Sequence, residues 1–420
     1  MKTKAVRLHG EMDLRLEEFE LPEMKEDEIL ARVISDSLCA STYKAAKQGS
    51  AHKRVHDDIA EHPAIVGHEF CGEILKVGAK WENDYKAGDR FIIQPALNYK
   101  GSSDAPGYSY SYVGGDATYI VIPNEVMETK CLISYDGASF FAGSMTEPYS
   151  CVIGTFHAMY HTRNGSYIHH MGIREGGNML MLAGNGPMGQ AAIDYILHCN
   201  RRPSLLVVTG RRQEHLDRLA QLLTVEDAAA NGVELHYFNT AATENPEEDL
   251  RSLTGGGGYD DVLVFAPVAA MVEMGDHLLA ADGCLNFFSG PSDREFKALF
   301  NFYNVHYAST HIVGTSGGNT EDMKEAVAMM NSGRINPSIL VSHVGGLNAV
   351  AEATLHLPEL PGSKKLIYTG VNMPLTAISD FEKLGSDDPF FAELDRLCKA
   401  NHGLWSVEAE KYLLGMKAEK

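Results

Sequence analysis

Residues 179–197 read MLMLAGNGPMGQAAIDYIL, an apolar run followed by three glycines and a second apolar run. The first run predicts a buried strand, and the second, which starts at Gln190, predicts a helix. The glycines between them suit a tight turn, a close approach of backbone to ligand, and close packing of helix on strand. Because a helix N-terminus also attracts phosphate, the stretch predicts a dinucleotide-binding loop. Its residues are Gly184, Asn185, Gly186, Pro187, Met188 and Gly189.

Further apolar runs follow at the spacing of alternating strands and helices. They include Leu205–Thr209, Asp261–Phe265 and Cys284–Phe288. Such alternation implies a parallel sheet with right-handed crossovers, so we assign residues 152–308 to an α/β domain of the Rossmann type. The glycine-rich stretch at residues 252–259 has no helix start directly behind it and is interpreted as a turn.

Residues 1–151 have a different sequence pattern, with short alternating apolar runs separated by glycine and proline. Examples are Ile29–Ile34 and Arg90–Pro95. This pattern predicts a β-rich domain. A chain of 420 residues also exceeds what one hydrophobic core usually serves, which favours two domains. After about residue 375 the sequence becomes charged and helix-prone, which predicts one or two amphipathic helices packed on the body or on a neighbouring subunit.

The composition excludes several classes of partner. A formal net charge of −20 disfavours nucleic acid and anionic membrane surfaces. The first 30 residues lack the apolar core of a signal peptide, and no later run is long enough to span a bilayer. The seven cysteines are scattered without paired spacing, as expected for reduced thiols. We therefore expect a cytoplasmic protein.

The end of the second predicted strand bears on the choice of coenzyme. Gly210 stands where an NAD-binding domain usually carries an acidic residue for the ribose hydroxyls. Arg211 and Arg212 follow it, and guanidinium groups bind a 2′-phosphate in bidentate fashion. NADP(H) is therefore favoured over NAD(H). The alternative is that both arginines are solvated charges at a helix start.

Candidate metal-ligating side chains occur in three separate fragments. Cys39 lies in DSLCAST, His68 in IVGHEFCG, and Glu147 in MTEP. A thiolate, an imidazole and a carboxylate can hold a catalytic zinc ion and leave a fourth position open. Taken singly, each has an ordinary interpretation, as a core cysteine, a structural histidine and a helix cap.

In this order, and with the glycine loop behind them, the three fragments resemble the zinc-dependent medium-chain dehydrogenase/reductase family, near its sorbitol and polyol-phosphate branch. The resemblance runs from about residue 4 to about residue 370. It implies a GroES-like catalytic domain over residues 1–151, a Rossmann domain with a doubly wound parallel sheet, and a return of residues 309–420 to the catalytic domain with a helical C-terminal extension.

The resemblance also implies roles for individual residues. Cys39, His68 and Glu147 take the zinc-ligand positions. Glu69 is a carboxylate near the metal that can enter the coordination shell, and Ser41 starts the proton relay. Further residues expected at the cofactor are Thr209, Ser289 and Gly290.

A second, structural zinc is not expected. Many members of the family hold one with four closely spaced cysteines, but no cysteine lies between Cys71 and Cys131. Because a site of that kind needs four thiolates, we predict one zinc per chain.

The resemblance implies that the chain reduces L-sorbose 1-phosphate to D-glucitol 6-phosphate with NAD(P)H. The alternative is a dehydrogenase of another polyol or polyol phosphate, such as sorbitol or galactitol phosphate. A substrate phosphate needs cations, and Lys44 and Lys47, followed by residues 52–54, lie close to Cys39 in sequence, although they could equally form a solvated basic surface. A zinc-free quinone reductase or a non-catalytic protein of the same fold would not need this ligand set. We expect a homo-oligomer, either a dimer or a tetramer.

Overall fold

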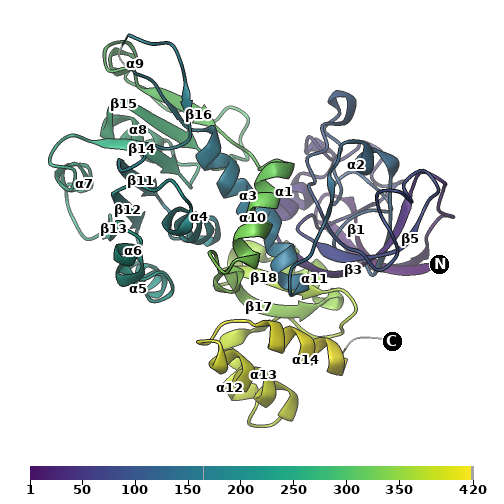
Figure 1. Cartoon of the computed structure of the whole chain (residues 1–420). Helices are drawn as coiled ribbons and strands as arrows, with labels where there is room; N and C mark the ends of the chain where they lie inside the picture. The colour runs from purple at the N-terminus through teal and green to yellow at the C-terminus, as the bar shows by residue number, and fades with distance from the viewer. Residues whose placement is uncertain (164, 418–420) are drawn as a thin grey trace. The chain divides into compact units, whose positions relative to one another are not determined.

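The computed structural model describes residues 1–163 and 165–417 (Figure 1). The chain forms two compact units. Unit 1 comprises Met1–Glu147, Met323–Asn331 and Pro337–Lys420, and unit 2 comprises Pro148–Asp322 and Ser332–Asn336. Both units are therefore built from segments that are discontinuous in sequence.

Unit 2 contains a six-stranded sheet in which all neighbours pair in parallel. In spatial order its strands are β13 (Glu234–Asn239), β12 (Leu205–Gly210), β11 (Asn178–Leu182), β14 (Tyr259–Val264), β15 (Leu279–Phe287) and β16 (His311–Gly314). This arrangement confirms the predicted parallel α/β sheet. The strand order reverses between β11 and β14, and ligands of such sheets bind outside the carboxyl ends of the strands at the reversal. The predicted dinucleotide loop follows β11 at this point.

Helices connect the strands of unit 2 (Figure 1). They are α4 (Pro187–His198), α5 (Gln213–Leu222), α6 (Val225–Ala230), α7 (Pro246–Ser252), α8 (Ala269–Leu278) and α9 (Phe302–Tyr307). Among them, α5, α6 and α8 pack against the sheet. A short hairpin of β9 (Tyr160–His161) and β10 (His170–Met171) completes the unit. The glycine-rich stretch before β14 forms a turn, as predicted.

Unit 1 is built on an eight-stranded sheet in the order β19-β17-β18-β3-β5-β6-β8, with β7 paired to β3. Its strands are β3 (Ile29–Leu38), β5 (Cys71–Val77), β6 (Arg90–Ile93), β7 (Tyr119–Ile122), β8 (Leu132–Ser134), β17 (Val341–Gly346), β18 (Lys364–Tyr368) and β19 (Thr376–Ala377). A three-stranded sheet of β2 (Asp13–Glu20), β1 (Lys2–Gly10) and β4 (Ala64–Ile65) lies in the same unit. The prediction of a β-rich N-terminal domain is confirmed.

Short helices and 3-10 turns connect these strands. The helices are α1 (Ala40–Gln48), α2 (Asn124–Glu128) and α11 (Val350–Leu355), while α3 (Phe140–Ala158) and α10 (Thr320–Asn331) continue from one unit into the other. The 3-10 turns are η1 (Gly49–Ala51), η2 (Tyr99–Gly101), η3 (Pro337–Leu340), η4 (Leu347–Ala349), η5 (Leu357–Glu359) and η6 (Ile378–Asp380).

Three helices end the described chain, where the sequence predicted one or two. They are α12 (Phe381–Leu384), α13 (Pro389–Ala400) and α14 (Val407–Lys417), drawn in yellow in Figure 1. The additional boundary arises because Asp388 caps α13 by accepting a hydrogen bond from the backbone nitrogen of Phe390, with Pro389 at the first helical position. The helices pack on unit 1, and the fully buried Trp405 donates a hydrogen bond to the Tyr368 hydroxyl (2.9 Å).

Over the described residues, the structure has no helix that combines the length and the apolar character needed to cross a membrane. All seven cysteines are free thiols.

Candidate active site

Glycine is required in the loop that carries His68 and in the segment that packs on this loop. Gly67 has a φ of +86°, and a Cβ atom there would lie 2.1 Å from a carboxylate oxygen of Asp36. Gly107 has a φ of +82°, and its Cβ atom would lie 2.1 Å from the carbonyl oxygen of Gly67. Side chains at either position would therefore displace the loop and move His68.

Cys39, His68 and Glu69 form one compact group of metal-ligand atoms. Their donor atoms all lie within 4.8 Å of one another. Cys39 ends the connection from β3 and occupies the N-cap of α1. His68 and Glu69 precede β5 and are only 3% and 1% exposed. Two segments distant in sequence thus bring a thiol, an imidazole and a carboxylate together, although the carboxylate of this group is Glu69 and not the predicted ligand Glu147.

Hydroxyl groups orient the imidazole of His68. The Thr42 hydroxyl lies 3.2 Å from Nδ1. On the other side, the hydroxyls of Ser41 and Tyr108 each lie 3.2 Å from Nε2, and Ser41 Oγ is also 2.9 Å from Cys39 Sγ. Nε2 therefore faces the thiol and two hydroxyls, which is the side on which a metal ion or a substrate oxygen would bind.

The electrostatics of this group suit a divalent cation. Burial and then the charge of Glu69 raise the pKa of the Cys39 thiol to about 12 in the metal-free protein. Burial, Lys364 and Arg54 lower the pKa of His68 well below its usual value, which leaves a neutral imidazole that can coordinate. Because a bound metal stabilises thiolate over thiol, the residues present fit a zinc ion.

Glu147 lies within helix α3, directly before Pro148, and is therefore not a helix cap. It is outside the compact group of donor atoms. Its negative charge nevertheless contributes to raising the pKa values of Cys39 and Lys364, which places its carboxylate in their neighbourhood. Its role as a zinc ligand stays a prediction.

Lys364 is a residue of the site that the sequence did not reveal. Its Nζ atom donates to both carboxylate oxygens of Glu69, at 2.6 Å from Oε2, and the Ser37 hydroxyl donates to the same carboxylate. Burial opposes the charge of Lys364, but Glu69 and then Cys39 raise its pKa above the usual value. The site therefore holds a buried ammonium group beside its donor atoms. The feature that could have indicated this residue is the pair of lysines at the start of β18, a strand that is fully buried in the structure.

Tyr108 is a second residue that the sequence did not reveal. Its ring centroid lies 4.8 Å from that of His68 and 5.8 Å from that of His52. Burial, followed by the charge of Cys39, raises its pKa well above the usual value, so the phenol keeps its proton. Tyr108 belongs to the cysteine-free interval of the sequence, whose tyrosines gave no sign of which one would reach His68.

The dinucleotide loop of unit 2 has the expected backbone geometry. A Cβ atom on Gly189 would lie 1.9 Å from the carbonyl oxygen of Gly184, so helix α4 packs on the loop in a way that only glycine allows. Gly186 is the N-cap of α4, and a Cβ atom there would meet no atom within 4 Å. The N-terminus of α4 is therefore open to a ligand, which fits the pyrophosphate of a dinucleotide.

Models of two known domain families match this chain. The alcohol dehydrogenase GroES-like domain matches residues 25–130, and the zinc-binding dehydrogenase domain matches residues 187–332. The chain is 50% identical to the L-sorbose 1-phosphate reductase of Klebsiella pneumoniae, over 98% of this chain and 97% of that protein. It is 49% identical to the mannitol-1-phosphate 5-dehydrogenase of Aliivibrio fischeri, over the same shares of the two chains.

The chain belongs to the zinc-binding dehydrogenase family. Its fold is also similar to that of 2R,3R-butanediol dehydrogenase from Bacillus subtilis, with a TM-score of 0.70 and 19% identity, over 87% of this chain and 99% of that one. The predicted family and its GroES-like and Rossmann architecture are thus confirmed, as is the prediction of a zinc-dependent alcohol or polyol dehydrogenase.

In this dehydrogenase, Gly210 lies at the end of β12, close to the side chain of Asn185. A Cβ atom on Gly210 would lie 2.8 Å from the side-chain amide nitrogen of Asn185. Arg211 and Arg212 are exposed and form no ion pair with a described residue, so both guanidinium groups can receive an anion. Their role in coenzyme choice stays a prediction.

The other predicted cofactor residues lie at strand ends of the same sheet. The buried Thr209 hydroxyl accepts from the backbone nitrogen of Ala183 (3.0 Å) and donates to Met181 (3.3 Å). Ser289 follows β15, and its hydroxyl is buried without a hydrogen-bond partner, while the adjacent Gly290 is exposed. The Ser289 hydroxyl is therefore available to a ligand.

Lys44 and Lys47, the predicted phosphate-binding residues, both lie on α1. Lys44 is partly buried and Lys47 is exposed. Their assignment to a substrate phosphate also stays a prediction.

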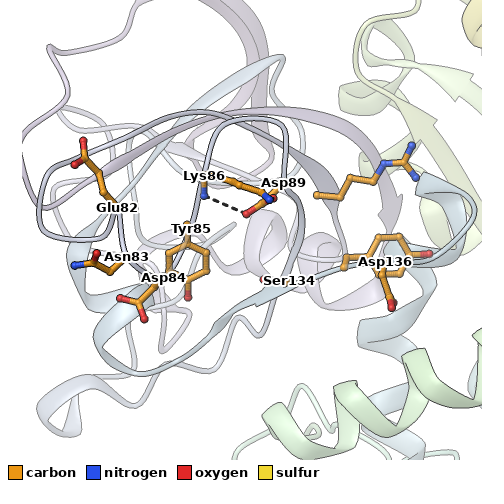
Figure 2. Close-up of a pocket in the computed structure, with 10 residues that line it drawn as sticks. Glu82, Asn83, Asp84, Tyr85, Lys86, Asp89, Ser134 and Asp136 are labelled. Atoms are coloured by element: carbon orange, nitrogen blue, oxygen red, sulfur yellow. Dashed lines mark hydrogen bonds and ion pairs between the residues drawn. The ribbon is translucent and has the colours of Figure 1, made fainter.

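A separate pocket of about 570 Å³ opens in unit 1 of the dehydrogenase (Figure 2). Its charged lining residues are Glu82, Asp84, Lys86, Asp89, Arg90 and Asp136. Asp89 accepts a hydrogen bond from the backbone nitrogen of Lys86 (3.1 Å; Figure 2). None of the lining residues belongs to the metal-binding group, and the acidic excess disfavours an anionic substrate.

Proposed function

We propose that this dehydrogenase interconverts a ketose phosphate and a hexitol phosphate, with L-sorbose 1-phosphate and D-glucitol 6-phosphate as the pair. The proposal depends mainly on the 50% identity to the Klebsiella pneumoniae L-sorbose 1-phosphate reductase across 98% of the chain. The similar match to a mannitol-1-phosphate 5-dehydrogenase supports a second candidate pair, D-mannitol 1-phosphate and D-fructose 6-phosphate. Both candidates are phosphorylated, and both reactions exchange a secondary alcohol and a ketone.

In the proposed mechanism Cys39, His68 and Glu147 would hold one zinc ion per chain. When bound, the zinc ion supplies Lewis-acid polarisation of the substrate carbonyl and the nicotinamide supplies hydride. Glu69 would be a supporting residue and not a ligand, because Lys364 and Ser37 already hydrogen-bond to its carboxylate. If Glu69 left that ion pair to bind the metal, the buried ammonium group of Lys364 would lose its counter-ion. Glu147 is therefore the better third ligand.

Ser41 is the proposed proton donor to the substrate oxygen during reduction. Its hydroxyl lies within hydrogen-bond distance of both the Cys39 thiol and His68 Nε2, so it would be close to a substrate oxygen bound at these two side chains. Ser41 is partly exposed, so its proton can be replaced from solvent. The buried Tyr108 hydroxyl provides a second donor that can hold the developing oxyanion.

NADP(H) is the proposed coenzyme. The glycine loop and the N-terminus of α4 would receive the pyrophosphate, and Arg211 and Arg212 would receive the 2′-phosphate. Thr209, Ser289 and Gly290 would lie along the cofactor at the carboxyl ends of the strands. The unpartnered Ser289 hydroxyl and the unpaired arginines support this assignment.

A coenzyme-oxidation assay tests the proposal. L-sorbose 1-phosphate and D-fructose 6-phosphate are each compared with the unphosphorylated ketose, with NADPH and with NADH. The measurements are repeated after chelation and after restoring zinc. We expect fastest turnover of L-sorbose 1-phosphate with NADPH, loss of activity on chelation and recovery with zinc. Turnover of free L-sorbose at least as fast as that of its 1-phosphate would overturn the proposed substrate.

We further propose that the dehydrogenase is a cytoplasmic homo-oligomer that binds neither nucleic acid nor membrane. Exposed apolar side chains gather on α9 and on the edge strand β16, including Phe302 (73% exposed), Tyr303 (68%) and Ile312 (42%). An uncovered apolar edge of this kind favours association with a second copy. Light scattering should therefore give the mass of a dimer or a tetramer, and a monomer would contradict the proposal.

A further inference from the structure

The loop between η1 and β4 places Arg54 next to the active-site tyrosine. The guanidinium carbon of Arg54 lies 5.1 Å from the ring centroid of Tyr108, whose hydroxyl contacts His68 Nε2. The guanidinium group of Arg54 and the imidazole of His68 therefore both lie near the same tyrosine ring.

The backbone around Arg54 is fixed by hydrogen bonds. Its carbonyl oxygen accepts from the Ser109 hydroxyl (2.7 Å), and its nitrogen donates to Nδ1 of His52 (3.3 Å). The carbonyl oxygen of Lys53 accepts from the Ser103 hydroxyl (2.9 Å). These hydrogen bonds tie the loop to the segment that carries Tyr108, and the guanidinium group packs against the ring of that tyrosine.

Arg54 has no carboxylate partner among the described residues, unlike three other arginines of this acidic chain. Arg7, Arg32 and Arg174 each pair with an acidic side chain. Among the described residues none forms an ion pair with Arg54, although the chain contains 56 acidic residues. Its positive charge also acts on the site, since it adds to the effects of burial and Lys364 on His68. A partly buried, unpaired guanidinium group is a natural site for an anion.

The other cations near the site are less suited to this role. Lys364 is already neutralised by both oxygens of Glu69. Lys47 is exposed on α1 and would lose side-chain entropy on binding. Arg54 is held against an aromatic ring and can bind phosphate through two parallel hydrogen bonds.

We propose that Arg54 binds the phosphate group of the substrate and makes the enzyme selective for phosphorylated ketoses. This inference rests on the proposed function. In L-sorbose 1-phosphate the ester lies on the carbon next to the carbonyl carbon, so its phosphate must bind close to the metal. Arg54, which packs against the Tyr108 ring, provides the cation for it.

Steady-state kinetics of Arg54→Gln test the inference. The substrates are L-sorbose 1-phosphate and L-sorbose without phosphate. For the phosphorylated substrate we expect kcat/KM to fall about 10- to 100-fold, mainly through KM, as for loss of a charge-assisted hydrogen-bond pair. For the free ketose kcat/KM should change less than about twofold, because no phosphate contact is lost. Arg54→Lys keeps the positive charge but cannot form two parallel hydrogen bonds to phosphate. Its kcat/KM for the phosphorylated substrate should therefore lie between those of the wild type and Arg54→Gln.

The control variant is Arg15→Gln, which removes an exposed arginine of the same unit that pairs with Asp13. Zinc content and the thermal unfolding midpoint establish that each variant is folded and loaded. Equal losses of kcat/KM for both substrates in Arg54→Gln would overturn the role of Arg54 and leave the proposed function standing. A wild-type enzyme without preference for the phosphorylated ketose would instead overturn the proposed function, and this inference with it.

Discussion

The Nζ atom of Lys364 lies 2.6 Å from Oε2 of Glu69, and both side chains are almost completely buried. Glu69 belongs to the same compact group as Cys39 and His68. The ion pair therefore compensates a negative charge in a metal-binding group that holds a thiol and lies near a second carboxylate. The contribution of this ion pair to the free energy of unfolding can be measured separately from that of the metal.

Lys364→Met should destabilise the metal-free protein strongly. The substitution leaves the Glu69 carboxylate buried without its cation, a loss that typically costs about 3–5 kcal/mol. Zinc should recover part of the loss, because the ion then compensates the same carboxylate. Chemical unfolding of unit 1, followed with and without a chelator, measures both effects.

The double variant Lys364→Met/Glu69→Gln provides the control for this prediction. Removing the carboxylate as well should restore most of the lost free energy of unfolding, because no uncompensated charge remains. If the changes in the free energy of unfolding caused by the two single substitutions simply add in the double variant, the ion pair does not stabilise the site.

Glu147→Gln should weaken zinc binding more than Glu69→Gln. Glu69 is engaged by Lys364 and Ser37, whereas Glu147 is the proposed third ligand. Loss of a direct ligand should lower zinc affinity by more than the roughly 10- to 100-fold expected for a supporting residue. Competition with a chromophoric chelator measures both affinities. The opposite order would identify Glu69 as the third ligand.

The dinucleotide loop could be predicted because its determinants are local. Strand β11, the glycines and helix α4 follow one another within residues 178–198, so periodicity and glycine spacing were sufficient. Cys39 and His68 could be named as candidate ligands because their fragments resemble those of a known family, and the structure brings their donor atoms together.

Lys364 and Tyr108 could not be predicted because their roles depend on distant pairing. In the antiparallel pairing of β18 with β3, Lys365 lies opposite Leu38, next to Cys39 in the chain. Nothing in the sequence of either strand specifies that register. Tyr108 is likewise one of several tyrosines in a loop, and only the folded loop brings its hydroxyl to His68.

Arg211→Ala and Arg212→Ala should each reduce the preference for NADPH. Both side chains are exposed and unpaired, so their removal leaves no buried group without a partner. Loss of a charged hydrogen bond to the 2′-phosphate should lower kcat/KM for NADPH about tenfold or more and leave kcat/KM for NADH nearly unchanged. Equal decreases of kcat/KM for NADPH and NADH would show that the arginines do not bind the 2′-phosphate.

His198 should make the stability of unit 2 depend on pH. It lies at the end of α4, with Nδ1 3.2 Å from an oxygen of Asp194 and Nε2 3.0 Å from one of Asp227. Hydrogen bonding to Asp194 raises its pKa from 6.5 to about 9. Its stabilising contribution is therefore fully present below pH 6.5 and is lost as the pH rises towards 9.

The unfolding midpoints of wild type and His198→Gln, compared across this pH range, check the prediction. The gap between them should be widest near pH 6 and should close above about pH 9. A gap that does not change with pH would show that the protonated imidazole adds no stability.

Glu410→Gln should destabilise unit 1 although it lies far from the metal-binding group in sequence. The Glu410 carboxylate is 3% exposed and accepts hydrogen bonds from the backbone nitrogens of Phe140 and Phe141 (2.8 Å each) and from the Tyr368 hydroxyl (2.9 Å). It thus caps helix α3, which carries Glu147. Glutamine offers one acceptor oxygen in place of two and presents an amide donor to groups that are themselves donors. We expect a loss of about 1–3 kcal/mol in the free energy of unfolding.

Glu408→Gln is the matched control, because it removes the same charge from an exposed position on the same helix. Its unfolding midpoint should stay close to that of the wild type. If Glu410→Gln also weakens zinc binding while Glu408→Gln does not, the C-terminal helices hold α3, and with it Glu147, in place for the metal. Equal midpoints for the two variants would instead mean that the cap on α3 contributes nothing to the fold.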